Sequence, residues 1–209
     1  TLGGNFTTTY RYAGLQHHLR GLGSLGFASV TARNEETGIE TKTFYNQDYN
    51  NHTQGVIDRV VTQHDNGTVL SDASNSWSAV VVDAGTAGER YRRHLDNIDR
   101  TKRDLNGAFL SREFMSHSYD AYDNLLQSNE LLYDGQGALV RSKTTTNTYF
   151  TPDVSNWLIS LLDSSVAVST ATGMPAVVRK SAWEYLPGTG RKIIEKVIDP
   201  VTEMIVNET

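Results

Sequence analysis

The fold class of this chain is decided by two related strings, Tyr119-Asp120-Ala121-Tyr122-Asp123-Asn124-Leu125 and Tyr133-Asp134-Gly135-Gln136-Gly137-Ala138-Leu139. Each string places Tyr-Asp before a turn-forming pair and a Leu just after it. A bulky β-former that ends one strand, a turn rich in Asp, Asn or Gly, and an apolar residue that begins the next strand are typical of a β-hairpin. Because the string recurs, the sequence predicts a hairpin unit stacked on itself, in which no unit buries its apolar face alone.

Further turn and strand signals recur along the chain. Asn66-Gly67 and Asn106-Gly107 each stand between β-prone runs, which is a strong hairpin signal. Gly38 is suited to the left-handed position of a turn that precedes the alternating stretch Ile39–Tyr45. The apolar run Ala79–Val82 is expected to be a buried strand. The remaining predicted strands are Thr7–Tyr12, Val56–Gln63, Thr68–Ser71, Tyr91–Arg103, Ala108–Tyr119, Val166–Thr170, Ala182–Leu186 and Arg191–Ile198.

One segment is open to two interpretations. Thr151-Pro152-Asp153 resembles a helix cap, and apolar residues follow it at helical spacing as far as Leu162. A short turn that runs into the strand Val166–Thr170 fits the same residues, and we favour it. No other long segment has a helical period, so the predicted class is all-β, an antiparallel meandering sheet.

Composition and charge exclude several kinds of function. The 209 residues carry a formal net charge of −5, which gives no electrostatic footprint for nucleic acid. The basic stretch Arg90–Arg103 is interleaved with acidic residues and is interpreted as a solvated strand face. The absence of Cys excludes disulfides and thiolate chemistry. No apolar run has the length of a membrane helix.

The ends of the sequence suggest a segment of a longer polypeptide. Thr1-Leu2-Gly3-Gly4-Asn5 contains neither an initiator Met nor a signal peptide. Ile205–Thr209 stops within an expected strand. We therefore expect the rest of the same polypeptide to be the main partner, and the isolated segment to self-associate through unpaired strand edges.

The Tyr-Asp strings resemble the YD repeat of Rhs proteins and of the B and C components of bacterial Tc toxin complexes. Other stretches are similar to passages of those toxins and of SpvB-like chains: Thr9–Gly14, Gly21–Phe27, Thr37–Thr41, Tyr45–Asp48, Asn156–Ile159, Trp183–Tyr185 and Thr189-Gly190. The resemblance spans nearly all of residues 1–209, with degenerate repeats in 1–110 and clearer ones in 111–209. Leu22 departs from the family pattern, and Asn124 is interpreted as replacing the repeat glycine, since Asn tolerates positive φ.

The resemblance implies a structural role. In that family, repeats form a long antiparallel strip that spirals into a hollow shell around a toxic domain until delivery. The chain would then be a secreted or exported shell segment, with a second toxin component as a further partner and no cofactor. The motif around the family's self-cleavage site is absent, so no catalytic residue is assigned. The expected structural repeat residues are Tyr119, Asp120, Asn124, Leu125, Tyr133, Asp134, Gly137, Leu139, Tyr185 and Gly190.

Structural roles are favoured for the individual residues as well. The tyrosines Tyr12, Tyr119, Tyr133 and Tyr185 are expected to pair across strands as a ladder, and Asp120 and Asp134 to cap backbone N–H groups. The histidines are scattered or, as His17 and His18, adjacent on a strand and on opposite faces, so no metal site is predicted.

Two other functions remain as alternatives. The first is a secreted or cell-surface β-rich module that binds glycans or a host protein, with sugars stacking on Tyr45, Tyr49, Trp77 and Trp157. The second is a glycosidase with paired carboxylates, which is the weakest hypothesis because no carboxylate pair stands out from the turn residues.

Overall fold

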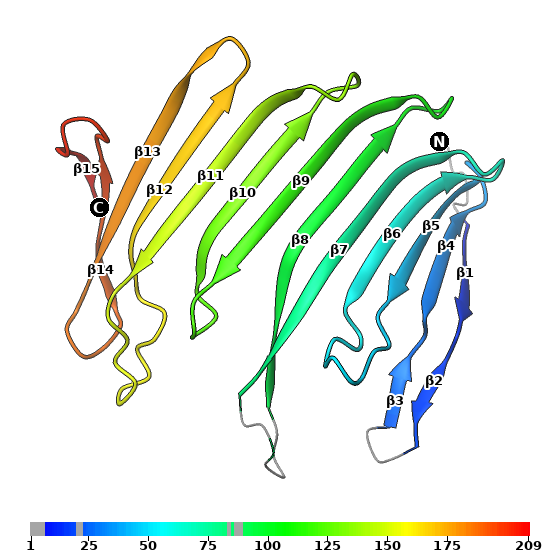
Figure 1. The fold of residues 1–209 in the computed structure, drawn as a ribbon, viewed down its shortest axis with the longest axis horizontal. Helices are drawn as coiled ribbons and strands as arrows, with labels where there is room; N and C mark the ends of the chain where they lie inside the picture. Colours follow the sequence, from blue (N-terminus) through cyan, green and yellow to red (C-terminus); the bar gives the residue numbers. More distant parts are fainter. Residues whose placement is uncertain (1–6, 20–22, 83–84, 86–89) are drawn as a thin grey trace, which may run out of the picture. The chain divides into compact units, whose positions relative to one another are not determined.

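The chain is an all-β protein (Figure 1) in a computed structural model that describes residues 7–19, 23–82, 85 and 90–209. Thr1–Asn5, Gly21 and Leu22, which the sequence interpretation used, lie outside the described residues. The strands are β1 Thr8–Ala13, β2 Gln16–His18, β3 Gly23–Gly26, β4 Ser29–Asn34, β5 Ile39–Tyr45, β6 Ile57–His64, β7 Val69–Val81, β8 Tyr91–Arg103, β9 Phe109–Tyr119, β10 Leu125–Tyr133, β11 Leu139–Tyr149, β12 Leu162–Ala171, β13 Met174–Tyr185, β14 Lys192–Ile198 and β15 Ile205–Glu208.

The strands follow one another as a meander, which confirms the predicted class. A 13-stranded sheet has the order β1-β4-β5-β6-β7-β8-β9-β10-β11-β12-β13-β14-β15. β1 pairs with β4 instead of β2, and β2 and β3 form a separate two-stranded hairpin. We find no helix in the described part of the chain that has the length and apolarity needed to cross a membrane.

The chain divides into two compact units. Unit 1 comprises Thr1–Glu113 with Asp134–Ala138, and unit 2 comprises Phe114–Tyr133 with Leu139–Thr209. In unit 1 the antiparallel ladder runs from β1 through β4, β5, β6 and β7 to β8, and the long strands β7 and β8 make its most extensive pairing. In unit 2 an equivalent ladder runs from β10 through β11, β12, β13 and β14 to β15.

One turn geometry recurs at 64–68, 104–108, 120–124 and 134–138. In the last of these, the Asp134 N–H donates to the Ala138 carbonyl at 2.9 Å and the Gly137 N–H to the Asp134 carbonyl at 3.0 Å. Gly137 has φ 80°. This three-residue loop, with its last residue in the left-handed region, matches the right-handed twist of the flanking strands. The Asn-Gly signals at 66–67 and 106–107 produce the same turn, so both hairpin predictions are confirmed.

At several strand ends the pairing between neighbouring strands shifts by one residue, and a tyrosine stands at the shift. Tyr133 pairs with Leu139, whereas the preceding Leu132 pairs with Arg141, so Val140 is an extra residue on the partner strand. Tyr45, Tyr149 and Tyr185 stand at equivalent shifts. A bulge of this kind increases the local twist and redirects side chains. Tyr133 therefore occupies the last pair before its turn.

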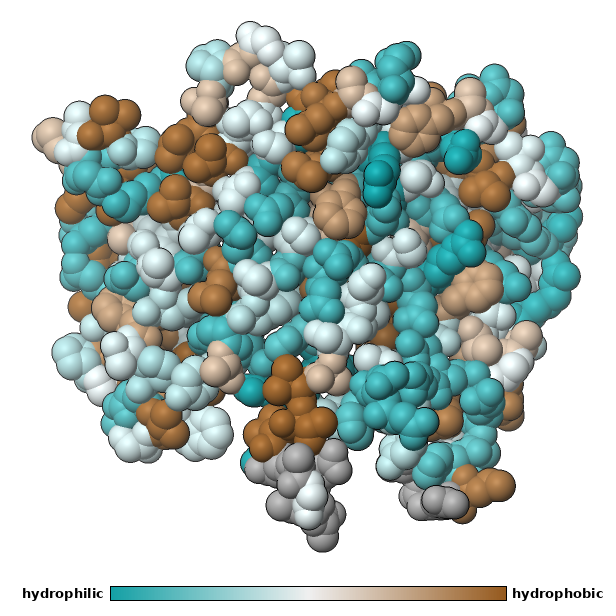
Figure 2. Space-filling view, in the orientation of Figure 1, coloured by the Kyte–Doolittle hydropathy of each residue, from teal (hydrophilic) through white to brown (hydrophobic). Residues whose placement is uncertain are grey.

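The fold has almost no core. Val61, 8% exposed, is the one apolar side chain among the described residues that is buried. The accessible surface is 13390 Å², whereas a folded monomer of this mass exposes about 9,700 Å². Figure 2 shows hydrophobic residues scattered among hydrophilic ones on the face that it displays. Backbone hydrogen bonds and cross-strand side-chain pairs therefore hold each unit together.

The expectation that Ala79–Val82 is a buried strand is wrong. Ala79–Val81 ends β7, with Val80 42% exposed and Val82, just beyond the strand, 43% exposed, while Ala79 and Val81 are half-buried. This alternation is that of a strand with one face open to solvent. An apolar run alone does not show whether a second layer covers the sheet.

The segment 151–161 forms a turn and not a helix, as favoured from the sequence. Asp153 and Leu158 form an isolated antiparallel bridge, and Trp157 has φ 57°. The Asp153 carboxylate accepts hydrogen bonds from the Ser155 hydroxyl at 2.6 Å and from the Asn156 N–H at 3.1 Å. These bonds hold the pKa of Asp153 below its ordinary value.

The carboxylate of Asp134 is expected to stabilise its turn. It accepts hydrogen bonds from the N–H groups of Gln136 at 3.0 Å and Ala138 at 2.9 Å. Asp134→Ala leaves both donors without this acceptor and should lower the free energy of unfolding by about 1 kcal/mol, with a smaller loss for Asp134→Asn. Urea unfolding followed by circular dichroism measures the change. Gln136→Ala, an exposed position in the same turn, is the control, and an equal loss there would contradict this role.

Candidate functional sites

The predicted repeat residues lie at turns. The Asp120 carboxylate accepts hydrogen bonds from the Tyr122 N–H at 2.7 Å and the Asn124 N–H at 2.9 Å, as Asp134 does in its own turn. Asp104 caps the turn at 104–108 in the same way, although the sequence analysis did not include it among the repeat residues. The signal was present, because Asp104-Leu105-Asn106-Gly107 has the same Asp-x-x-Gly spacing.

Asn124 has a different role from the one expected. The positive φ of its turn belongs to Asp123, at 67°, which is the residue equivalent to Gly137. Asn124 is 6% exposed, and its side-chain amide donates to Asp120 Oδ2 and to the carbonyl of Ile159, both at 2.8 Å. It thereby ties the β9–β10 turn to the β11–β12 connection within unit 2. The sequence interpretation matched Asn124 to the repeat glycine, whereas the residue equivalent to Gly137 is Asp123, one position earlier.

Tyr185 and Gly190 flank the β13–β14 turn. The Tyr185 ring meets Phe150 edge-on, with centroids 5.8 Å apart. Gly190 has φ 66°, and a Cβ at this position would lie 2.8 Å from Leu158 Cδ2. The turn therefore packs against the β11–β12 connection, and only glycine satisfies both constraints without strain.

The repeat tyrosines do not form a single ladder. Tyr119 ends β9 and Tyr133 ends β10, so the two stand at opposite ends of β10, roughly 25 Å apart along the strand. Tyr12 instead contacts Phe27, with ring centroids 5.0 Å apart. The expected ladder is wrong because a meander places successive turns at alternate ends of the sheet. Leu125 and Leu139 begin the strands that follow the two turns; Leu125 is half-buried and Leu139 is 47% exposed.

Ion pairs cross the strands of unit 1. Arg59 donates to both carboxylate oxygens of Asp72, at 2.8 and 2.5 Å, and Arg112 does the same to Asp99. These four residues line a shallow hollow of about 420 Å³. Each guanidinium is already neutralised by a carboxylate, so the hollow is poorly suited to an anion. The hydrogen bonds from Arg59 lower the pKa of Asp72 below its ordinary value of 3.8.

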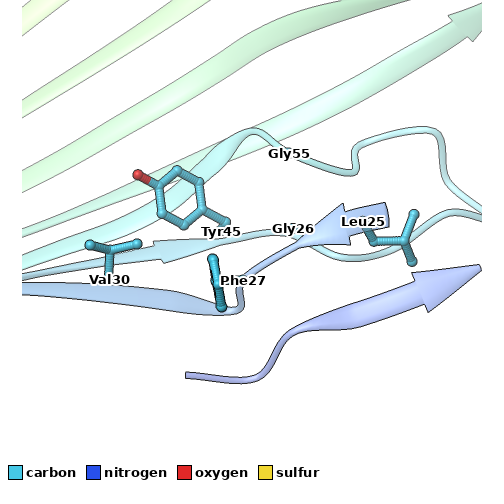
Figure 3. Close-up of a pocket in the computed structure, with 6 residues that line it drawn as sticks. All are labelled: Leu25, Gly26, Phe27, Val30, Tyr45 and Gly55. Carbon is cyan, nitrogen blue, oxygen red and sulfur yellow. The ribbon is translucent and has the colours of Figure 1, made fainter. Parts of the chain in front are cut away.

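An apolar hollow of about 340 Å³ lies in unit 1 (Figure 3). Phe27, Val30 and Tyr45 lie close to one another around it, and Leu25 lies further along on β3. Next to it, the Gln47 amide donates to the carbonyls of Gly14 and Gly26, at 2.8 and 2.9 Å. Among the described residues that line the hollow, the Tyr45 phenol is the one ionisable group.

A polar cavity of about 510 Å³ lies between the β5–β6 connection and β7. The connection contributes amide, carboxylate, imidazole and hydroxyl groups, and β7 contributes an indole ring and small residues. The lining residues are Asn46, Asp48, Asn50, Asn51, His52, Thr53, Trp77, Ser78, Ala79 and Val81. Only the first part of this connection, up to Asp48, belongs to a string that resembles the toxin family, although the density of Asn and Asp beyond it was a signal for a structured loop.

A row of rings leads away from this cavity. The rings of His18 and Tyr49 are tilted against each other with centroids 4.4 Å apart, and His52 stacks on Tyr91 at 4.7 Å. The Arg93 guanidinium lies over the Tyr91 ring, 5.1 Å from its centroid. Tyr45 lines the apolar hollow, Tyr49 contacts His18 and His52, and Trp157 belongs to unit 2. Trp77, the fourth aromatic residue of the glycan hypothesis, lines the polar cavity.

The described residues contain no group of three or more His, Asp or Glu side chains placed to hold a metal ion. His64 lies 2.5 Å from the neighbouring Asp65 carboxylate. His17 and His18 are on the short strand β2, where the His18 ring contacts the Tyr49 ring at a tilt.

Comparisons with known proteins identify the fold. No family model matches the chain, and no curated protein matches it. The crystal structure of TcdB2-TccC3 superposes with a TM-score of 0.75 over 94% of this chain and 16% of the matched chain, at 10% identity. The fold is shared with chains of Tc toxins. The TcdB2-TccC3-Cdc42 complex gives a TM-score of 0.73 over 94% of this chain and 15% of that chain, at 10% identity. The Photorhabdus luminescens Tc holotoxin pore gives 0.71 over 92% and 15%, also at 10% identity. This chain therefore spans only a small part of the chains that it resembles.

Asn124 is predicted to stabilise unit 2. Asn124→Ala removes two donated hydrogen bonds from a buried position and should lower the free energy of unfolding by about 2 kcal/mol. Thermal and urea unfolding measure the loss. Ala138→Asn, which places an amide at the equivalent, exposed position of the other repeat, is the control and should leave stability nearly unchanged. Similar effects of both changes would contradict the bridging role.

The Arg59–Asp72 pair predicts a pH dependence. Because the pKa of Asp72 is lowered in the folded state, its stabilisation is fully present above 3.8 and is lost as the pH falls through the lowered value. Asp72→Asn should therefore lower the free energy of unfolding by about 0.5–1 kcal/mol at neutral pH. At a pH where wild-type Asp72 is protonated, the substitution should have no effect. Urea unfolding across the acid range measures the difference. Ser74→Ala, in the same hollow, does not titrate, so its effect should not change with pH.

Proposed function

We propose that this chain is a structural segment of a bacterial Rhs/Tc-type toxin shell that encloses a toxic domain and helps to deliver it. The observation that carries the proposal is the shared fold, with a TM-score of 0.75 to TcdB2-TccC3. The near-absence of buried apolar residues supports it, because a sheet that remains half exposed on both faces suits a wall better than the interior of a compact enzyme.

The repeated turns support the same role. Asp104, Asp120 and Asp134 cap successive hairpins in one manner, so the chain extends by adding hairpins and needs no central core. The main partner is the remainder of a longer polypeptide, and a second toxin component is a further one. The segment would be exported as part of that larger protein.

The edge strands of the described sheet agree with such an assembly. β1 and β15 are the first and last strands of the sheet order, and every residue of both is exposed. An uncovered edge offers backbone groups to another strand. In the longer polypeptide these edges would pair with neighbouring repeats, and in the isolated segment they would promote self-association.

No catalytic role is proposed for the segment. The carboxylates of Asp104, Asp120 and Asp134 accept hydrogen bonds from their own turns, and Asp72 and Asp99 are held by arginines. These five acids serve the ladder and the turns.

The test is single-particle electron microscopy of the full-length polypeptide that contains this segment. We expect a hollow particle whose wall includes the hairpins at 104–108, 120–124 and 134–138, with protein density inside. A solid particle, or a shell from which this segment projects as a separate domain, would overturn the proposal.

A further inference from the structure

The polar cavity between the β5–β6 connection and β7 has the size and the rigidity of a binding site. Its volume of about 510 Å³ lies within the range of small-molecule sites, which is roughly 300–1,000 Å³. Its location in unit 1 is independent of the proposed shell role.

The wall formed by the connection is fixed by its own hydrogen bonds. Asp48 Oδ2 accepts from the Asn51 side-chain amide at 2.6 Å and Oδ1 from the Asn51 N–H at 3.2 Å, while Asn46 Oδ1 accepts from the Asp48 N–H at 2.6 Å. The Asn51 donors hold the pKa of Asp48 below its ordinary value, so this carboxylate stays ionised. Such a loop is preorganised and loses little entropy when a ligand binds.

The other end of the connection is held from β8. His52 has φ 57°, in the left-handed region, and its carbonyl accepts a hydrogen bond from Arg93 Nε at 2.8 Å. Thr53, which follows it, is 5% exposed, and its N–H donates to the Asp48 carbonyl at 3.2 Å. The loop is thus closed on itself and anchored to a strand.

The opposite wall is an aromatic platform of fixed orientation. The Trp77 indole N–H donates to the Ile57 carbonyl at 2.9 Å, which holds the ring at the cavity. An indole face packs well against the C–H face of a sugar ring, whose hydroxyls point outward from its edge. The polar groups of the connection face such an edge from the other wall.

The charge of the lining selects among ligands. Asp48 is the one carboxylate in the described lining, and neither Lys nor Arg is part of it. Anionic ligands such as phosphates or sialylated sugars would therefore meet a carboxylate that no Lys or Arg of the described lining offsets. The Asn50 side-chain amide makes no hydrogen bond to another described residue and can serve as donor and acceptor for a ligand hydroxyl.

We propose that this cavity binds a neutral carbohydrate, with a sugar ring stacked on Trp77 and its hydroxyls hydrogen-bonded by Asn50 and Asp48. Asp48 accepts from hydroxyls through lone pairs that its bonds to Asn51 leave available. The Asn50 side chain makes none of the hydrogen bonds that close the loop, so its role in the site is to recognise the ligand.

The test is saturation-transfer NMR on the 209-residue chain with maltose, cellobiose and lactose as neutral probes and sialyllactose as the charged one. We expect saturable binding of at least one neutral disaccharide with a dissociation constant of about 1 mM, and weaker binding of sialyllactose than of lactose. Asn50→Ala should weaken binding about 5- to 10-fold, because it removes one ligand hydrogen bond from an exposed position without disturbing the fold.

Variants at tryptophan separate stacking from folding. Trp77→Ala should abolish binding and Trp77→Phe should weaken it, with folding checked by circular dichroism. Trp157→Ala is the matched control, since Trp157 is 77% exposed and lies in unit 2, and it should bind as the wild type does. The proposal is overturned by the absence of saturable binding, by preference for sialyllactose, or by binding that Asn50→Ala leaves unchanged. None of these results would affect the shell proposal.

Discussion

The backbone ladder carries this fold, because the sheet has almost no apolar core to support it. With Val61 the one buried apolar residue of the described chain, burial supplies far less free energy than in a compact domain. What remains is hydrogen bonding between strands, supplemented by pairs such as Arg59–Asp72 and Arg112–Asp99. A strand can contribute to such a ladder only if its register is fixed. The residues that set register are therefore the ones that matter most for the fold.

Register is set at the turns, and the repeat residues divide this task among them. Asp134 caps the loop, Gly137 supplies the left-handed residue, and Tyr133 pairs with Leu139 between the bulge at Val140 and the turn. The bulge adds twist where the chain reverses. Each member of the repeat thus has a local backbone reason for its identity, and none of these reasons requires contact with a distant residue. Such a unit can be repeated along a chain without redesign of its neighbours.

This locality explains what the sequence could and could not predict. The class, the meander and the hairpins at Asn66-Gly67 and Asn106-Gly107 follow from short-range rules, and the structure confirms them. The bond from Asn124 to the Ile159 carbonyl could not be predicted by such rules, because Ile159 is far away in the sequence. The polar cavity was missed for the same reason, since Trp77 meets the β5–β6 connection only after three strands have paired. The exposure of Val80 depends on whether a second layer covers the sheet, which periodicity does not show.

A ladder that supports itself leaves its connections free to vary. The connection from Asn46 to Val56 lies outside the strand pairs and is closed by hydrogen bonds of its own, with Arg93 of β8 anchoring it at His52. Loops positioned by a rigid scaffold are where binding residues concentrate. A wall and a binding site are therefore compatible in one chain, because they depend on different residues: Asp134 and Gly137 for the turn, Asn50 and Trp77 for the cavity. The same division predicts that changes in the connection alter ligand preference without altering the sheet.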